Sequence, residues 1–343
     1  MDITAILNTI RANASANYQA RIPEATRTNM EDIRFAMLDD DNVQVANEFM
    51  STLLNKLVKS VLHTKRFSNP LKPLKKGSKP DGDTIEEIYT NFMKCEGYNP
   101  NSGADLMKRN LPDTKTVYHR MNYQVTYPVT VSREALSRAF KSPEALEKYI
   151  TDTINTLYNS AELDEFANMK ELLKSAYTKG AMKKVTVPDP IGGEANAREF
   201  IKSVKTVSGM MAFPSTEWNG YTTAQTTDTE PIWTFSRKGE QVLILDTATD
   251  VSVAVDVLAA SFNMTVAEFN DTRKIVIDQF PAANVRGMLI DEAFFQVYDD
   301  LFLFKSWENP KSLYNNYYLH VWQTLAFSIL VNAVAFEVDP AAA

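Results

Sequence analysis

Residues 142–178 read SPEALEKYITDTINTLYNSAELDEFANMKELLKSAYT, the longest stretch of this chain with the pattern of one helix. Ser142 can cap such a helix, and Pro143 fits its first turn. Apolar residues recur at spacings of three and four and predict one buried stripe, made of Leu146, Ile150, Ile154, Leu157, Ala161, Met169, Leu172, Leu173 and Ala176. Acidic residues between them predict a solvent-exposed opposite face, and they are Glu144, Glu147, Asp152, Glu162 and Asp164.

A helix of this length has an architectural consequence. At 1.5 Å per residue it is about 50 Å long, which is the span of a whole domain. We therefore expect it to serve as a strut on which other elements are arranged. The alternative is an ordinary surface helix of a large α/β enzyme.

The composition is that of a globular protein, since 44% of the 343 residues are hydrophobic and 23% are charged. That length suggests two or three structural units. The net charge of −7 argues against a generally basic surface that wraps nucleic acid, because phosphate binding relies on clustered Lys and Arg. The single Cys95 excludes an intrachain disulfide and a cysteine metal cluster, and it fits a reducing compartment. Residues 1–21 lack an apolar core behind a basic start, so we expect no export signal.

The first part of the chain changes character twice. Residues 1–29 are polar, with too few large apolar groups for a core of their own, and predict an arm. Residues 30–64 carry apolar residues mostly every four positions and predict two helices joined at the acidic turn 39–41. Residues 65–83 contain three prolines, two glycines and six basic residues, which predicts a basic, exposed connector that is neither helix nor central strand.

Residues 84–96 and 114–131 predict the two strands of a long hairpin. The second segment alternates polar and apolar residues, and turn-forming residues at 97–113 separate the two. A two-stranded ribbon is marginally stable alone, so we expect it to lie on its own domain or on a neighbouring subunit. A short helix at residues 133–140 should follow and lead into the strut.

The region after the long helix alternates between strands and helices. We expect a strand at 183–188, an amphipathic helix at 194–211, a loop at 213–229 and an α/β unit that begins near Trp233. Within that unit the pattern predicts strands at 241–246, 274–278 and 287–291 and a helix at 250–262.

The last stretch is free of charged residues from 312 to 336 and is rich in aromatic residues. A membrane helix at the tail is one interpretation, since a bilayer needs about 20 apolar residues. Scattered polar residues and frequent β-branched and aromatic ones suit buried strands better. We therefore expect a C-terminal pair of strands packed under the strut.

The sequence shows no motif for catalysis. The three histidines, His63, His119 and His320, are far apart and lack metal-ligand spacing, so each is expected to supply a structural hydrogen bond. No nucleotide-binding loop and no G-x-S-x-G occurs, and the acidic residues at 39–41 and 299–300 read as solvated turns. The basic run at 65–79 could contact phosphate or an acidic neighbour. We predict no catalytic, cofactor-binding or metal-binding residues and no enzyme.

The order of elements is more informative than any motif. An arm, a long hairpin, a long helix, an inserted α/β unit and buried terminal strands resemble the major capsid protein of tailed bacteriophages, whose Hong Kong 97 type fold is shared with encapsulins. The distinctive blocks look like head proteins of phages of Gram-positive or gut bacteria: VLAASFN at 257–263, IVIDQF at 275–280, LIDEAFF at 289–295, LYNNYYLHVW at 313–322 and NAVAF at 332–336.

The resemblance implies an α+β fold with four parts. Residues 1–64 would form an N-terminal arm and helices, and residues 65–131 an extended loop that reaches across a neighbouring subunit. Residues 132–190 and 301–343 would form a peripheral domain whose spine helix is 142–178, and residues 191–300 an axial domain.

The same resemblance implies assembly through hexamers and pentamers into an icosahedral head around packaged double-stranded DNA. The partners would be further copies of the chain, a separate scaffolding protein, a portal at one vertex and DNA bound without sequence specificity, with no membrane involved. A separate scaffold is expected because residues 1–64 are too short for a large fused scaffolding domain. No cross-linking Lys and Asn pair can be assigned. The candidate subunit-contact residues are Lys108, Arg109, Tyr118, Arg120 and Tyr123.

Three alternatives remain open at this point. An encapsulin-like compartment shell shares the architecture. A cytoplasmic α/β hydrolase or transferase would need a concave cluster of titratable groups. A tail or connector protein would form rings rather than closed shells.

Overall fold

In the computed structural model, the structure describes residues 3–26, 28–38, 45, 48–49, 52, 67–79, 84–97, 109–132, 138, 143–224, 230–253, 273–309 and 314–338. Contacts divide the chain into two compact units. Unit 1 comprises Met1–Asn69, Tyr123–Glu165 and Asp299–Gln323, and unit 2 comprises Pro70–Asn122, Phe166–Tyr298 and Thr324–Ala343.

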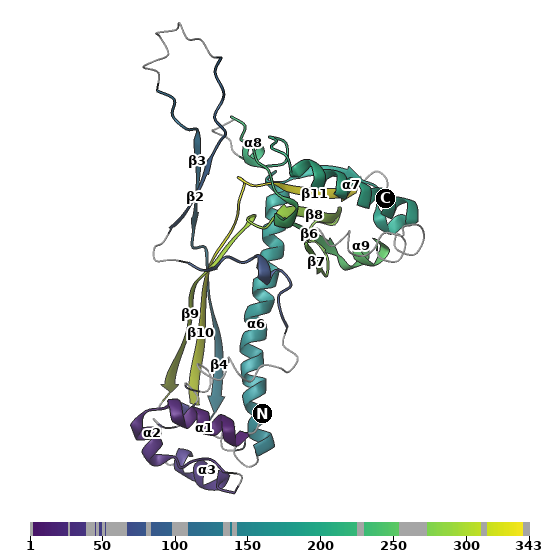
Figure 1. Cartoon of the computed structure of the whole chain (residues 1–343). Helices are drawn as coiled ribbons and strands as arrows, with labels where there is room; N and C mark the ends of the chain where they lie inside the picture. Colours follow the sequence, from purple (N-terminus) through teal and green to yellow (C-terminus); the bar gives the residue numbers. More distant parts are fainter. Residues whose placement is uncertain are drawn as a thin grey trace. The chain divides into compact units, whose positions relative to one another are not determined.

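Unit 1 combines three short helices with part of a sheet. The helices are α1 (Ile3–Asn13), α2 (Ala16–Arg21) and α3 (Met30–Leu38). Strand β4 (Tyr123–Ser132) pairs antiparallel with β10 (Tyr314–Phe327), from Tyr123 opposite Gln323 to Ser132 opposite Tyr314. The sheet order is β1-β9-β10-β4, where β1 is Gly77–Ser78 and β9 is Phe295–Asn309. Figure 1 shows α1–α3 in purple beside the ends of β4, β9 and β10.

The N-terminal segment is folded, which corrects the expectation of an arm at residues 1–29. Leu7, Ile10, Tyr18 and Ile22 are buried in one cluster with side chains from β4, β10 and the long helix. The segment alone has too few apolar groups for a core, as the sequence indicates, but it supplies one wall of a shared core. The second predicted helix, within residues 30–64, lies mostly outside the described residues.

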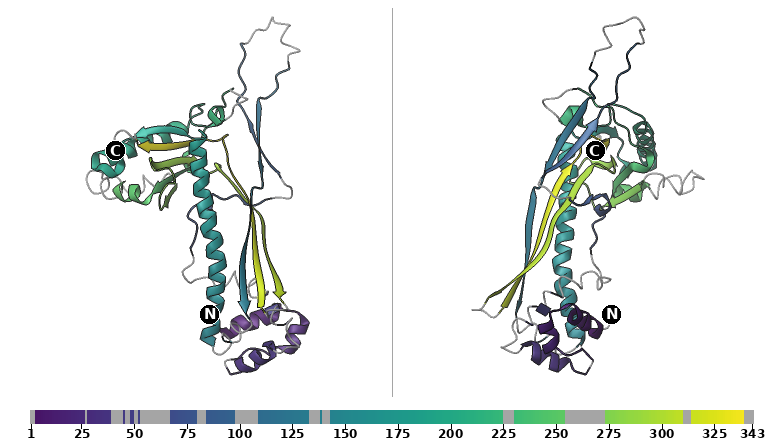
Figure 2. Two further views of the ribbon diagram at one scale, coloured as in Figure 1. Left: turned by 180° about the vertical axis from the view of Figure 1, so that it is seen from behind. Right: turned by 60° about the vertical axis from the view of Figure 1, so that its left-hand side comes forward.

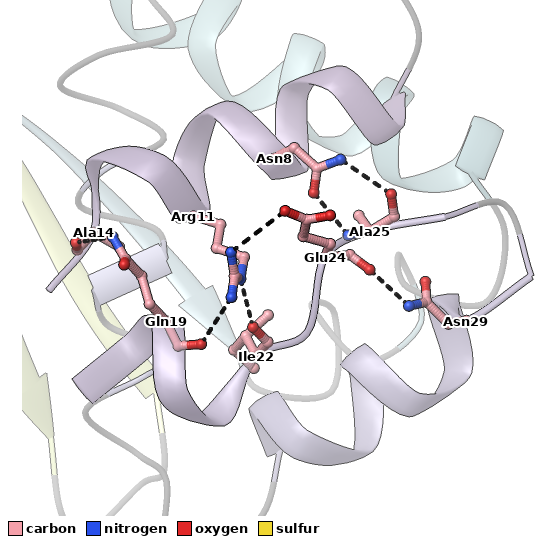
Figure 3. Close-up of polar contacts among 8 residues, drawn as sticks. All are labelled: Asn8, Arg11, Ala14, Gln19, Ile22, Glu24, Ala25 and Asn29. Atoms are coloured by element: carbon pink, nitrogen blue, oxygen red, sulfur yellow. Dashed lines mark hydrogen bonds and ion pairs between the residues drawn. The ribbon is translucent and has the colours of Figure 1, made fainter. Parts of the chain in front are cut away.

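Polar side chains hold the turn between α2 and α3, as Figure 3 shows. The Asn8 side chain exchanges two hydrogen bonds with the backbone of Ala25, of 3.1 and 2.7 Å. Arg11 donates from Nε to the carbonyl oxygen of Ile22 at 2.8 Å and from Nη2 to that of Gln19 at 3.1 Å. These bonds satisfy backbone groups that apolar packing leaves without partners.

The long helix is present as α6 (Pro143–Thr178), which confirms the helix predicted at 142–178. Leu157, Met169, Leu173 and Ala176 of the predicted stripe are buried. The expected cap, Ser142, lies outside the described residues. The expectation that Glu162 lies on the solvent-exposed face of the helix is wrong. This residue is only 9% exposed, and it accepts a hydrogen bond from the backbone N–H of Asn69.

Unit 2 is built on a five-stranded sheet in the order β5-β11-β8-β6-β7. The strands are β5 (Lys183–Val187), β6 (Gln241–Asp246), β7 (Arg273–Ile277), β8 (Val285–Asp291) and β11 (Ala333–Val338). β11 is parallel to β5 and antiparallel to β8, and β6 is antiparallel to β8 and parallel to β7. Helix α7 (Glu194–Met211) matches its prediction and packs Phe200, Val204 and Met211 against the sheet.

The sheet of unit 2 joins strands that the resemblance assigns to two different parts. β5 and β11 fall in the ranges expected for the peripheral domain, and β6, β7 and β8 in the range expected for the axial domain. The C-terminal strands are also separate, because β10 pairs with β4 whereas β11 pairs with β5 and β8. The predicted buried C-terminal strands are therefore present as β10 and β11, but the expectation that they pair with each other is wrong, and β9 was not predicted.

Shorter elements complete unit 2. The helix predicted at 250–262 begins as α9 (Thr247–Ser252), and most of its range lies outside the described residues. Residues 213–224 are mostly loop, with the short helix α8 (Tyr221–Ala224). The connector forms the 3-10 turn η3 (Lys72–Leu74) and the short β1, and it is less exposed than expected because Leu71 and Leu74 are buried. Among the described helices, none is long and apolar enough to cross a membrane.

The predicted hairpin is shorter than expected. β2 (Thr84–Thr90) pairs antiparallel with β3 (Thr114–Arg120), and Figures 1 and 2 show the two side by side. The second predicted strand, 114–131, is broken at residues 121–122, because β4 changes partner and joins β10. The predicted helix at 133–140 lies outside the described residues, apart from Arg138, which is helical.

Candidate assembly surface

The β2–β3 ribbon has two chemically different faces. Exposure alternates along both strands, and Glu86 lies opposite Tyr118 while Ile88 lies opposite Thr116. The outer face, as we call the exposed one, is made of Thr84, Glu86, Ile88, Thr90, Thr114, Thr116, Tyr118 and Arg120. The inner face carries the remaining residues of both strands.

Polar contacts hold the inner face together and fix it to the rest of unit 2. His119 Nε2 lies 2.9 Å from Glu87 Oε2, and the Ser328 hydroxyl donates to Glu87 Oε1 at 2.5 Å. The Tyr89 hydroxyl donates to the carbonyl oxygen of Trp233. At the end of the ribbon, the backbone N–H of Asn91 donates to the carbonyl oxygen of Asp113 at 2.8 Å. A ribbon held in this way does not depend on its own two strands for stability.

The outer face mixes apolar and charged groups. Ile88 is 59% exposed and Tyr118 is 62% exposed. The Tyr118 hydroxyl donates to Glu86 Oε1 at 3.0 Å, and this hydrogen bond to a carboxylate raises the pKa of Tyr118. An exposed isoleucine and tyrosine beside an acid and a base match the composition of protein interfaces, where aromatic and Arg residues are enriched.

The segments beyond the ribbon are exposed at residues 92–97, with Met93 and Cys95, and at residues 109–113, with Leu111. Leu111 is 77% exposed, the largest exposure among the large hydrophobic side chains of the described part of the chain. Apolar groups at such positions favour a partner that covers them.

The candidate contact residues do not all share this surface. Tyr118 and Arg120 are on the outer face, and Arg109 is exposed beyond it. Lys108 lies outside the described residues. Tyr123 begins β4, is half-buried and pairs with Gln323 in unit 1, so the structure does not place it on the ribbon.

Ile88 and Leu111 belong to the exposed set and were missed by sequence reasoning. The alternation of β2 carried the signal for Ile88, because residues 84, 86, 88 and 90 share one face of a strand. Leu111 gave no comparable signal, because it lies outside both strands.

The structural role expected for the histidines is confirmed for two of them. His119 is paired with Glu87, and His320 Nδ1 lies 3.0 Å from the Thr126 hydroxyl. His63 lies outside the described residues. Within those ranges no group of three or more His, Cys, Asp or Glu side chains could hold a metal ion.

The fold is shared with solved phage structures. A chain in the structure titled "Structure of head fiber and inner core protein gp22 of native bacteriophage P68" matches with a TM-score of 0.66 at 11% identity, covering 81% of this chain and 86% of that chain. A chain of the capsid of Staphylococcus phage Andhra matches with a TM-score of 0.63 at 12% identity, covering 82% and 87%. The fold is therefore the Hong Kong 97 type fold of phage capsid proteins, as the resemblance implies.

The sequence comparisons define the family. The model of the Phi29-like phage major capsid protein matches residues 7–337, and the chain belongs to this family. The major capsid protein of Bacillus phage PZA is 35% identical over 96% of this chain and 72% of its own length. That of Streptococcus phage Cp-1 is 27% identical over 98% of this chain and 94% of its own length. The chain is a major capsid protein of a tailed phage and a component of the virion.

Proposed function

We propose that this chain self-assembles through hexamers and pentamers into the closed icosahedral shell of a phage head, which encloses packaged double-stranded DNA. Its role is containment by repeated contact between copies, without catalysis. Membership in the capsid protein family is the observation that carries this proposal. The encapsulin, enzyme and connector alternatives are not favoured by these relatives.

The outer face of the β2–β3 ribbon is the proposed contact with a neighbouring copy. Complete burial of an isoleucine side chain stabilises by about 1.5–3 kcal/mol, so covering Ile88 would contribute roughly half of that per contact. A small free energy per contact suits a shell, because many copies repeat the contact and a misplaced subunit can still dissociate. Arg109, Tyr118 and Arg120 are proposed contacts on or beyond this face, and Lys108 and Tyr123 stay proposals from sequence alone.

The remaining partners follow from the same role. We infer a separate scaffolding protein during assembly, a portal at one vertex, and enclosed DNA held without sequence-specific contacts. The net charge of −7 supports loose containment, because a shell must enclose DNA without binding it tightly. The division into an N-terminal part at residues 1–64, an extended loop, a peripheral domain and an axial domain also stays a proposal.

Electron microscopy of the purified chain, with and without its candidate scaffolding protein, tests the proposed function. Closed shells tens of nanometres across are expected in at least one condition. Small discrete particles or open rings in every condition would contradict it. Deletion of residues 97–113 should leave the subunit soluble and weaken assembly, whereas loss of soluble subunit would count against the ribbon as a contact.

A further inference from the structure

A second exposed apolar surface lies on unit 2, at the segment 231–237. Its side chains alternate, with Ile232, Thr234 and Ser236 buried and Trp233 and Phe235 exposed. The Phe92 ring stacks on the Phe235 ring with centroids 6.5 Å apart. We call Phe92, Trp233 and Phe235 the aromatic platform. The three side chains are between 42% and 50% exposed.

The platform is fixed from beneath by buried polar contacts. The Thr234 hydroxyl contacts Asn332 Oδ1 at 2.5 Å and receives a bond from Asn219 Nδ2 at 3.1 Å. The Ser236 hydroxyl donates to Asp291 Oδ2 at 2.5 Å, and burial raises the pKa of Asp291. Burial of a carboxyl group and of amide side chains costs free energy unless these groups are hydrogen-bonded. When all of them are hydrogen-bonded, they hold the backbone in one conformation.

The platform is also tied to its neighbours in the chain. Asn91 Oδ1 accepts the backbone N–H of Trp233 at 3.1 Å, and Asn91 Nδ2 donates to the carbonyl oxygen of Pro231 at 3.2 Å. Thr234 and Ser215 exchange both backbone hydrogen bonds, of 2.9 and 3.0 Å. The rings are therefore presented by a rigid backbone, which lowers the entropy lost on binding.

We propose that the aromatic platform docks a second copy of this chain in the assembled shell. The proposal rests on the proposed function, since it assigns one of the contacts that function requires. Aromatic residues are enriched at protein interfaces, and Trp is among the residues that carry most of the binding energy there, so a rigid, partly exposed aromatic cluster is a surface suited to such a contact.

The size of the surface supports a copy of the chain over a small ligand. Met93 adjoins Phe92, and Phe213 precedes Ser215 by two residues; both are more than 60% exposed. Aromatic side chains present ~150–250 Å² each, so these five residues together offer on the order of 500 Å² of exposed surface. A standard interface buries about 800 Å² per partner, so the platform and its flanks supply more than half of one side.

Charge and continuity also favour a second copy. Arg237 and Lys238 are exposed directly after the platform, and the chain carries 43 acidic against 36 basic residues, so a second copy is a source of carboxylates for these two cations. Phe92 and Met93 follow β2 after the single residue Asn91, which makes the platform continuous with the ribbon in sequence. One neighbouring copy could cover both surfaces.

The test combines two variants with footprinting. In the full chain, Trp233→Ser with Phe235→Ser should leave the free subunit folded and soluble, with a lowered but still cooperative thermal unfolding transition because both side chains are partly buried, and should reduce the yield of closed shells at least tenfold. Trp233→Tyr with Phe235→Tyr keeps aromatic surface and should assemble within about twofold of the unchanged chain. In wild-type shells of the chain alone, hydroxyl-radical oxidation of Trp233, Phe92 and Met93 should fall severalfold relative to free subunits.

Three outcomes would overturn the proposal. Shells in which Trp233 is oxidised as fast as in free subunits, or a serine variant that assembles normally, would remove the platform and leave the proposed function standing. If the platform residues are protected from oxidation only while a scaffolding protein is present, the platform binds that protein instead of a second copy of the chain. A wild-type chain that forms no closed particle, either alone or with its candidate scaffolding protein, would overturn the proposed function and the platform with it.

Discussion

Residues 1–29 are expected from sequence to form an arm, and the β2–β3 ribbon to lie on its own domain or on a neighbouring subunit; the structure packs the first into an apolar core and holds the second along one polar face. In unit 1, α1 and α2 place Ile10 and Tyr18 in a shared apolar cluster. In unit 2, the ribbon is fixed along one face through Glu87 while Ile88 on the other face is exposed. A low count of apolar residues therefore does not identify an extended segment.

The difference lies in where polar side chains are used. In the N-terminal helices, Asn8 and Arg11 satisfy the backbone of a turn, so a few apolar residues suffice to complete the packing (Figure 3). In the ribbon, the backbone is satisfied by strand pairing, and side chains are left available for contacts on both faces. The side chains of the N-terminal helices therefore complete a folded core, whereas one face of the ribbon remains available for a contact.

Replacement of Ile10 by alanine tests whether the N-terminal segment belongs to a folded core, and it has the largest expected effect. Ile10 is 1% exposed, and truncation of a buried isoleucine removes packing and leaves a cavity, so we expect a loss of about 3 kcal/mol in the free energy of unfolding of unit 1. Hydrogen exchange of α1–α3, measured by mass spectrometry, should report it as faster exchange. Unchanged exchange would mean that the N-terminal segment is an arm after all.

Arg11→Ala tests the polar half of the argument. Two backbone carbonyl groups lose a charged donor, so we expect the N-terminal helices to be destabilised by about 2 kcal/mol, as measured by hydrogen exchange of the same peptides. Arg11→Lys keeps the charge without the two-pronged geometry and should give an intermediate loss. Arg34→Ala on α3, whose guanidinium stacks on the exposed Phe35, should change exchange little. Equal effects of Arg11→Ala and Arg34→Ala would refute the role of the turn contacts.

The sequence predicts the parts of the fold that rest on local pattern. Helix α7 matches its predicted bounds because its apolar residues follow one face, and Tyr118 and Arg120 share a ribbon face because strands alternate. The features that the sequence predicts wrongly depend on contacts with residues distant in sequence. β4 ends the hairpin because it pairs with residues 314–323, and Glu162 is buried because Asn69 bonds to it. No pattern within residues 114–131 or within the long helix carries that information.

Glu87→Ala sharpens the contrast between the two faces of the ribbon. The change leaves His119 and Ser328 without the carboxylate that joins them, and we expect the ribbon to lose about 1.5 kcal/mol of stability, measured by exchange of the amides in β2 and β3. Glu86→Ala is the matched control, because it is the neighbouring residue on the opposite face. Its exposed hydrogen bond to Tyr118 should contribute little to stability, because solvent screens it. If both variants loosen the ribbon equally, the inner face does not anchor it.

Ile88→Ala is the same chemical change as Ile10→Ala, made where the side chain is 59% exposed. Its effect on the unfolding of the free subunit should be the smallest of the series, within about 0.5 kcal/mol, because little packing is removed. The yield of closed shells should nevertheless fall severalfold, since the proposed contact between copies loses apolar area. A thermal melt of free subunits and particle counts by electron microscopy separate the two effects. Stability and assembly that change together would place Ile88 in the fold, and an unchanged yield would remove it from the contact surface.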